Sequence, residues 1–262
     1  MLQDYSREEA TKSLKNRPKF ISVSLRVAAY ISLVVISFFV AQQAVILLIK
    51  LVMFMGVPVV KMGGPLINAV FSVLIYLITI AIAIGIPWFI KKQKTSRREI
   101  GLHRLPSWMD IWIAPAGFVI YIIISIILSS IATAIFPWFN AAQQQDVGFT
   151  SLNFKYEYLL AFLTLVVVAP IAEEVLFRGY LFGKLRKFIP VWLAIILTSL
   201  TFGIIHGAWN LGIDTFALSL VLCSLRLITG SLWAPILLHM IKNGIAFYIL
   251  FINPTFFTTL GG

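Results

Sequence analysis

The stretch LLAFLTLVVVAPIAEEVLFRGYLFG, residues 159–183, decides how this chain folds. Residues 159–171 carry no charge, and the whole stretch is long enough to cross a bilayer as one helix. The same stretch contains two acids, Glu173 and Glu174, and one base, Arg178. Ionisable groups at membrane depth are expensive, so they indicate a functional site by default. We therefore predict a membrane-spanning helix that carries part of a functional site.

Helical geometry separates the three charged residues. Glu174 and Arg178 are four residues apart, so they share one helix face and can form an ion pair. Glu173 lies about 100° further round the helix and is therefore free to face a substrate or a water molecule. Pro170 cannot donate a backbone hydrogen bond, which favours a kink just before the acids. The alternative, a buried structural salt bridge with a spare carboxylate, stays open at this point.

Composition indicates the class of protein. Of the 262 residues, 60% are hydrophobic and only 12% are charged, against about half and about a quarter in soluble domains. Several uncharged apolar runs reach the length of about 20 residues that a bilayer crossing needs. The expected fold class is all-α, a polytopic bundle of transmembrane helices. The single cysteine, Cys223, excludes an intramolecular disulfide.

The apolar runs divide the chain into a polar tail and one integral-membrane domain. Residues 1–19 are polar and charged, and we predict that they form a cytoplasmic tail. Residues 20–262 are predicted to form a single membrane domain with its catalytic core at about 155–250. Seven crossings are expected, or eight if residues 20–64 contain an extra turn: 20–50, 66–90, 109–136, 159–182, 191–208, 216–228 and 232–252. The sixth is short, so we expect it to be tilted, buried or partly re-entrant.

Basic residues concentrate in alternate loops. Four segments are rich in Lys and Arg: the tail, residues 91–104, the turn 184–187 and the turn at Arg226. The intervening loops are poor in them: 56–65, 138–157 and 209–214. The positive-inside rule then places the N-terminus in the cytoplasm and the C-terminus outside. Basic loops facing anionic headgroups account for the formal net charge of +11, so no nucleic-acid partner is expected.

Two further motifs lie downstream, each in its own predicted crossing. Phe202 and His206 are four residues apart and share a helix face, as do His239 and Asn243. A single histidine in an apolar helix is more often structural than catalytic. Here two of the three histidines of the chain lie in separate crossings, beside other polar groups. We therefore predict that both belong to the same site as Glu173.

Glycines accompany these motifs. Gly179 and Gly183 follow the acids, and Gly203 and Gly207 lie on either side of the position of His206 along the chain. Small residues four apart let transmembrane helices approach closely. We expect the two glycine pairs to let the fourth and fifth crossings pack tightly against each other.

The residue types suit peptide hydrolysis. A carboxylate can activate water as a general base, and a nearby histidine can orient that water or carry a proton. A second histidine and an asparagine can donate hydrogen bonds to the oxyanion of a tetrahedral intermediate. The chain contains no Gly-x-Ser-x-Gly elbow, no Walker loop and no His-Glu-x-x-His helix, so those families of site are excluded.

Taken together, the three motifs resemble those of the CPBP family, the CAAX proteases and bacteriocin-processing enzymes also called Abi. The resemblance rests on three elements: Glu173-Glu174-x-x-x-Arg178, Phe202-x-x-x-His206 and His239-x-x-x-Asn243. It implies an α-helical intramembrane endopeptidase with a membrane-buried site. Glu173 and His206 would activate water, and the second histidine and the asparagine would form the oxyanion hole. Glu174, Arg178 and Phe202 would support these residues.

The resemblance also indicates the substrate class and the location. Family members act on prenylated proteins, on leader or signalling peptides, or in self-immunity to bacteriocins. A 262-residue chain with these loops looks more like a prokaryotic member. We therefore expect a membrane-associated protein or a leader or signalling peptide as substrate. The expected location is a prokaryotic cell membrane, with the lipid bilayer as a partner, and the oligomeric state stays open.

Several alternatives stay open. Two histidines and a glutamate are also ligand types of catalytic zinc sites, so zinc is an alternative cofactor. No metal ligand is assigned, because His239 and Asn243 fit an oxyanion role without a metal. Lys242 adds a cation between these two residues, and it could turn away, pair with Glu174 or alter the site. Two other classes remain: a proton-coupled transporter, which uses the same residue types, and a catalytically silent immunity or scaffold protein.

Overall fold

The structure is a computed structural model that describes residues 2–57, 64–92, 94–141, 143, 148–149 and 152–254, with side chains from Ser22 onward except at residue 91. Within these ranges every regular element is a helix, so the predicted all-α fold is confirmed. The elements are α1 (Leu2–Phe54), α2 (Pro65–Lys91), α3 (Arg97–Ile100), α4 (Trp108–Ile135), α5 (Lys155–Phe162), η1 (Leu163–Val168), α6 (Ala169–Glu174), η2 (Val175–Leu181), α7 (Phe182–Leu185), α8 (Val191–Ile204), α9 (Trp209–Thr229), α10 (Trp233–Phe247) and η3 (Tyr248–Ile252). Parts of the predicted loops 56–65 and 138–157, and residues 255–262, lie outside the described residues.

In the described part, six helical segments are long and apolar enough to cross a membrane: Ser22–Phe54, Pro65–Ile90, Trp108–Ile135, Lys155–Leu185, Trp209–Thr229 and Trp233–Ile252. They confirm a polytopic helical membrane protein. The predicted fifth crossing corresponds to the shorter apolar helix α8. The helix α1 also continues through the predicted tail, whose cytoplasmic location stays a prediction.

The fifth and sixth predicted crossings differ from the structure in their lengths. Helix α8 ends at Ile204 rather than near residue 208, and α9 has 21 residues where only 216–228 was expected. The reason is that the predicted loop 209–214 forms the first turns of α9. Its acid, Asp214, enters the bundle because Tyr121 and Ser125 of α4 donate hydrogen bonds to it at 2.6 and 2.7 Å. The polar residues at 209–214 were therefore read as a loop, although the charge of Asp214 is stabilised by hydrogen bonds from the neighbouring helix α4.

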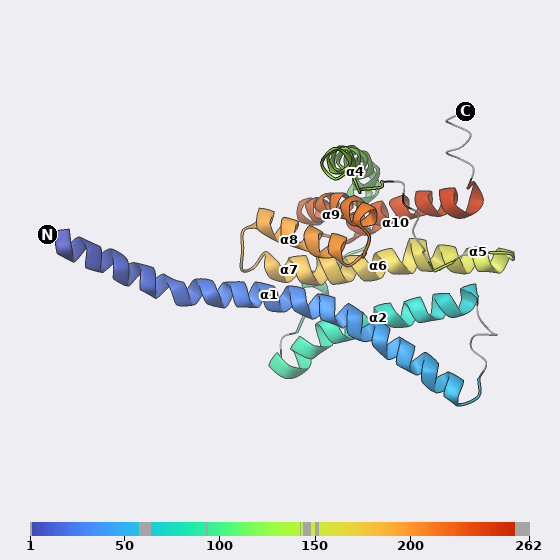
Figure 1. Cartoon of the computed structure of the whole chain (residues 1–262), viewed down its shortest axis with the longest axis horizontal. Helices are drawn as coiled ribbons and strands as arrows, with labels where there is room; N and C mark the ends of the chain where they lie inside the picture. Colours follow the sequence, from blue (N-terminus) through green and yellow to red (C-terminus); the bar gives the residue numbers. More distant parts are fainter. Residues whose placement is uncertain are drawn as a thin grey trace.

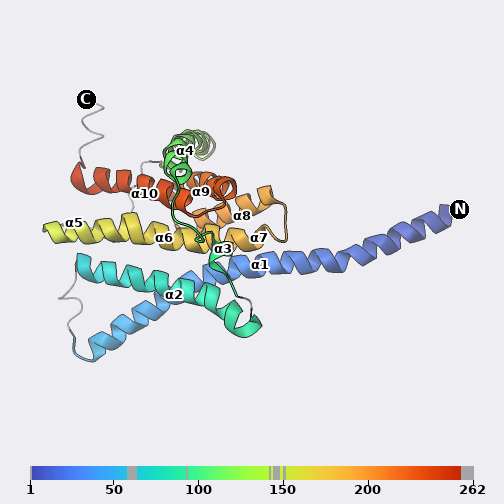
Figure 2. The same cartoon turned by 180° about the vertical axis from the view of Figure 1, so that it is seen from behind.

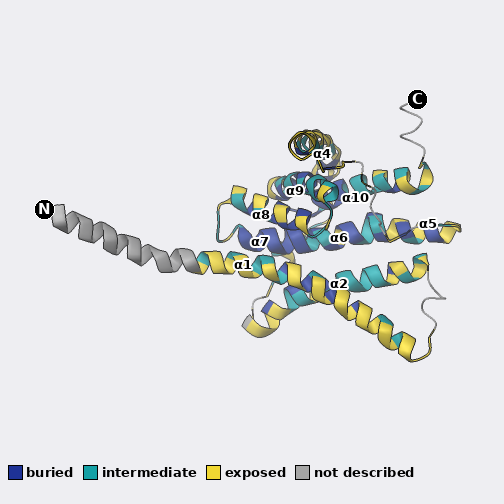
Figure 3. Cartoon of the chain, in the orientation of Figure 1, coloured by how far each residue is buried: buried dark blue, intermediate teal, exposed yellow. Residues whose placement is uncertain are grey.

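One long helix runs through the middle of the bundle. It extends over α5, η1, α6, η2 and α7, with α1 and α2 on one side and α8, α9 and α10 on the other (Figures 1 and 2). Its α6–α7 part is the most deeply buried region of the molecule (Figure 3). The core there is made of side chains from this helix: Leu176, Phe177, Tyr180, Leu181, Phe182 and Leu185. Side chains from α1, α2, α8 and α9 pack around them.

Two π-helical segments interrupt this central helix, one on each side of the acids. The Ala169 N–H bonds to the carbonyl of Thr164, and the Phe182 N–H to that of Phe177, which is the i→i−5 pattern of a π-helix. Pro170 has no N–H, so it cannot continue the α-helical pattern. The kink predicted at Pro170 stays a prediction; the structure shows a change of helical register beside this residue. Such π segments often occur at functional sites.

The predicted role of the glycine pairs is wrong. A Cβ at Gly179 would lie 2.8 Å from the Ile100 side chain, so this glycine makes room for α3 and not for the fifth crossing. A Cβ at Gly203 would lie 2.7 Å from the carbonyl of Gly212, which places α9 there. Gly207 has φ +74°, so it serves the turn after α8. The fourth and fifth crossings meet instead through Phe177 and Phe202, whose ring centroids are 4.9 Å apart.

Three of the predicted basic segments meet at one end of the bundle. Lys187, in the turn after α7, forms a salt bridge with Glu99 of α3. Arg226 of α9 donates a hydrogen bond to the Glu99 carbonyl at 3.0 Å. The hydrogen bond from Lys187, helped by one from the Ser96 backbone, holds the pKa of the Glu99 carboxyl below its usual value. The positive-inside rule requires such loops to lie on one side, and this contact brings them together.

Candidate active site

The acid motif lies in α6, at the centre of the long helix. Arg178 Nη1 donates to Glu174 Oε1 at 2.9 Å, and both side chains are fully buried, so the predicted ion pair is present. The Arg178 guanidinium also lies over the Phe202 ring, 4.3 Å from its centroid. Glu174 is therefore committed to Arg178 within its own helix. A cation over an aromatic face adds an attractive contact between this helix and α8.

Glu174 has a second partner that the sequence did not predict. The Nδ1 atom of His239, from α10, lies 2.8 Å from Glu174 Oε1. A carboxylate that holds one ring nitrogen of a histidine fixes the orientation of the ring and directs the other nitrogen elsewhere. Glu174 therefore links Arg178 of the central helix to His239 of α10. The Glu174 carboxylate therefore joins two helices through a single oxygen atom.

Glu173 faces away from Glu174, as helical geometry predicted. Tyr76 of α2 donates its hydroxyl hydrogen to Glu173 Oε1 at 2.6 Å. The other oxygen, Oε2, lies 3.8 Å from Nε2 of His239. That separation is too long for a direct hydrogen bond and suits a bridging water within reach of both atoms. The side chain of Glu173 is 12% exposed, so it is enclosed without being sealed.

His206 lies in the turn that follows α8. Its Nδ1 is 2.6 Å from the carbonyl oxygen of Phe202, and the two rings are 4.8 Å apart in an edge-on arrangement. The Phe202 ring also contacts His239 edge-on at 6.0 Å. Both histidine rings therefore contact the ring of Phe202, which links them.

Asn243 is placed one turn beyond His239, but its side chain has a partner in the central helix. Its amide nitrogen donates to the carbonyl of Leu165 at 2.9 Å. In the π register of η1, the N–H that would serve this carbonyl belongs to Pro170, which has none. The break in the helix therefore creates the acceptor that Asn243 binds. One N–H of the amide remains beyond this bond, since an asparagine amide has two.

Lys242 pairs with a residue that the sequence analysis had assigned to a loop. Its Nζ lies 3.4 Å from Asp214 Oδ2, which settles the open question of its partner. The hydroxyls of Tyr121 and Ser125 bond the other oxygen of Asp214. The signals that could have revealed this cluster are an acid close to an apolar run and hydroxyl residues in predicted crossings. Tyr76 gave a similar, equally weak signal.

A catalytic zinc can be tested on the donor set. In the part of the chain that the structure describes, no group of three or more His, Cys, Asp or Glu side chains is arranged to hold a metal ion. The Nδ1 atoms of His239 and His206 are held by Glu174 and by the Phe202 carbonyl, an arrangement also found in histidines that bind a metal through Nε2. Because no third ligand joins them among the described residues, we assign no metal to the site.

Comparison with known proteins gives a family match over the segment that contains the candidate site. A family model described as type II CAAX prenyl endopeptidase Rce1-like matches residues 155–245. The chain carries a CPBP-family domain. The matched segment runs from the start of α5 into α10, so it contains both acids, both histidines and Asn243. At the level of the CPBP family, the chain is a membrane protease with a peptide or protein substrate.

Individual relatives extend this comparison beyond the CPBP domain. MroQ of Staphylococcus aureus, described as a membrane-embedded CAAX protease, is 24% identical over 230 residues, which cover 85% of this chain and 89% of that protein. An uncharacterized 24.3 kDa protein of Escherichia coli is 33% identical over 89 residues, 32% of this chain and 41% of that protein. The protein YdiL of Bacillus subtilis is 31% identical over 77 residues, 29% of this chain and 32% of its own length. No solved structure gives a significant match.

Proposed function

We propose that the chain is an intramembrane endopeptidase that uses Glu173 and His206 to activate water. The observation that carries the proposal is the arrangement of Glu173 opposite His239, with Oε2 and Nε2 3.8 Å apart. A water bridging these atoms would meet a carboxylate able to take its proton. Glu174 fixes His239 from behind, and Tyr76 fixes the other oxygen of the base. Geometry of this kind positions a nucleophile, which a mere structural salt bridge does not require.

The proposed reaction moves one proton in each step. Glu173 takes a proton from the water as the oxygen attacks the peptide carbonyl, and a tetrahedral oxyanion forms. His239 Nε2 and the Asn243 amide donate hydrogen bonds to that oxyanion. The C–N bond then breaks, and the proton held by Glu173 passes to the leaving amine; we assign His206 an assisting role in these proton transfers. The products are a new carboxylic acid, which loses its proton to water, and a new amine.

The state of His239 follows from its two neighbours. While Nδ1–H donates to Glu174, Nε2 can donate to an oxyanion only if the ring carries a second proton. Glu174 and Glu173 lie on either side of the ring and balance that positive charge. The same arrangement lets His239 hold the attacking water before the reaction. Its assignment to the oxyanion hole therefore depends on a charged ring.

The finer substrate proposal is a membrane-associated protein or a leader or signalling peptide cleaved close to the membrane. Hydrolysis requires water at the depth of the site, so the residues must line a polar opening and not face lipid. The S. aureus relative is described as a CAAX protease, which supports cleavage of a membrane-bound protein. A peptidase assay of the purified full chain on a panel of membrane-proximal peptides tests the function. Absence of cleavage for the whole panel under conditions where the fold is intact would contradict it.

Replacement of Asn243 by alanine should lower kcat about 10²–10³-fold while KM changes little, as expected for loss of one oxyanion donor. The separate measurement of kcat and KM is important, because Asn243 also donates a hydrogen bond to the Leu165 carbonyl and its loss can affect stability as well as catalysis. A suitable control is Asn210→Ala, which removes another amide that donates to backbone carbonyls, those of Ala141 and Gln143. A variant that loses stability but retains wild-type kcat would show that Asn243 only ties α10 to the central helix.

We further propose that the N-terminus and the basic loops are cytoplasmic and that the end of α10 is outside. Cys223 is buried, so single cysteines introduced at Ser96 and at Asn253 can be labelled without changing the native one. A membrane-impermeant maleimide added to intact cells should label Asn253→Cys and spare Ser96→Cys. Labelling of both positions from the same side would contradict the proposed topology, which rests on the positive-inside rule.

A further inference from the structure

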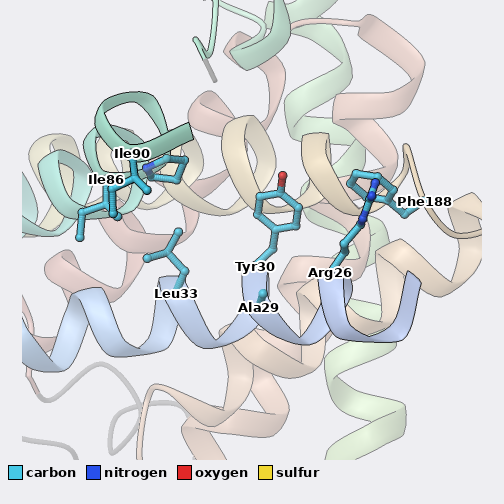
Figure 4. Close-up of a pocket in the computed structure, with 8 residues that line it drawn as sticks. Arg26, Ala29, Tyr30, Leu33, Ile86, Ile90 and Phe188 are labelled. Carbon is cyan, nitrogen blue, oxygen red and sulfur yellow. The ribbon is translucent and has the colours of Figure 1, made fainter. Parts of the chain in front are cut away.

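A cavity outside the candidate active site lies between α1, the end of α2 and the turn after α7 (Figure 4). Its volume is about 400 Å³, within the range of small-molecule sites. Leu33, Ile86 and Ile90 line one part, and Arg26, Tyr30 and Phe188 line the other. The cavity is therefore apolar at one end and cationic at the other. None of the residues proposed for catalysis lines it.

The arrangement of α1 and α2 explains the space. The two helices cross and diverge toward the end of α2 (Figure 1). Pro87 lies inside α2 near that end, and Lys92, the residue that caps the helix, has a left-handed backbone. A proline in a helix removes a hydrogen bond and favours a bend, so the last turn of α2 does not follow α1. The cavity occupies the place where the two helices separate.

Arg26 gives the cavity its charge. It begins a segment of α1, residues 27–49, that contains no other charged residue. Its guanidinium lies 5.5 Å from the centroid of the Phe188 ring, and among the described residues it forms no salt bridge. Three further cations follow in the nearby turn, Lys184, Arg186 and Lys187, of which only Lys187 is paired with Glu99. Among the side chains that the structure describes, the cationic end of the cavity therefore has positive charge in excess and no acid in its lining.

We propose that this cavity binds one anionic phospholipid. The phosphate would bind the Arg26 guanidinium, and an acyl chain would lie along Leu33, Ile86 and Ile90. Three observations favour a lipid over a soluble anion. First, free phosphate would make no contact with the apolar wall of the cavity. Second, the cavity lies where transmembrane segments begin or end. Third, basic clusters at that depth attract anionic headgroups. Arginine suits the phosphate because its guanidinium can donate two parallel hydrogen bonds.

Native mass spectrometry of the purified full chain tests the proposal. The protein is equilibrated in detergent with equal amounts of phosphatidylglycerol and phosphatidylcholine, and the lipids it retains are counted. We expect one retained phosphatidylglycerol, and about fivefold less of it in Arg26→Gln. Leu33→Trp should also reduce retention, because the larger ring fills the part of the cavity assigned to the acyl chain.

Matched variants separate the site from general effects. Lys50→Gln removes a cation from the far end of the span in α1, and Leu25→Trp adds a ring at a position that is 65% exposed and does not line the cavity. Both should retain phosphatidylglycerol as the wild type does. Equal retention of the two lipids, equal losses in Arg26→Gln and Lys50→Gln, or displacement by soluble glycerophosphate would each overturn the proposal. The readout does not involve peptide cleavage, so it is independent of the proposed function.

Discussion

Glu173→Gln is expected to lower turnover about 10²–10⁴-fold, the range of general-base catalysis, while the helical bundle stays folded. Glutamine has the same shape as glutamate but cannot take a proton from water. Its amide oxygen can still accept the hydrogen bond that Tyr76 donates to Glu173, so the contact between α2 and α6 should survive. The measurement is kcat on a cleaved peptide, with circular dichroism and thermal unfolding to confirm the fold.

A matched variant on the same helix makes the result specific. Glu157→Gln changes an acid near the start of α5, where its carboxylate accepts backbone hydrogen bonds from Asn153 and Phe154. It lies away from the candidate active site, and we expect kcat close to that of the wild type. If Glu173→Gln cleaved peptide at the wild-type rate, water activation by this residue would be wrong. Glu174, and not Glu173, would then be the acid that faces the substrate.

Glu174→Gln is expected to affect stability more than any other single change at the site. The carboxylate holds Arg178 and His239 through one oxygen, and the Glu174 and Arg178 side chains are fully buried. Removing one member of a buried ion pair leaves the other charge without a partner, at a cost of about 3–5 kcal/mol. The free energy of unfolding, measured by denaturant titration in detergent, should fall by this order. Activity should fall as well, because a glutamine amide cannot balance the positive charge that His239 needs in order to donate to the oxyanion.

A double variant distinguishes charge from packing. Replacing both members, as in Glu174→Leu with Arg178→Met, removes the unpaired charge, so the double variant should be more stable than Glu174→Gln alone. It should still be inactive, since His239 would have no carboxylate at Nδ1. If Glu174→Gln unfolded like the wild type, the buried pair would contribute little, and the cation–π contact of Arg178 with Phe202 would be the main restraint on this helix.

The two acids show how far local geometry reaches. The ion pair of Glu174 and Arg178 was predictable, because residues four apart in one helix are neighbours whatever surrounds them. That Glu173 does not share the helix face of Glu174 was predictable for the same reason. Its partners were not, since Tyr76 and His239 come from helices whose rotation no local rule determines. For the same reason the sequence left three possibilities open for Lys242, and only the structure shows that its partner is Asp214.

The glycines illustrate the opposite case, in which a local pattern gave the wrong neighbour. Four-residue spacing indicates that some helix or loop approaches closely, but it does not say which one. Gly179 faces α3, and Gly203 faces Gly212 of α9, because α8 and α9 form a hairpin beside the central helix. Asp214 was assigned to a loop for a similar reason, since the residues that donate hydrogen bonds to it lie about 90 residues away in sequence.

The sequence by itself determined the membrane class, the helical fold and the ion pair within the central helix, and it proposed most residues of the candidate site. These features depend on hydrophobicity, length and helical periodicity, which act over a few neighbouring residues. Only the tertiary structure decided which side chains meet across helices, including the histidine shared by the two acids and the hydrogen bond of Asn243 to Leu165. Such contacts depend on how packed helices are rotated, aligned and crossed. A π-helical turn adds one residue to a helix, and it thereby changes the direction of every side chain beyond it.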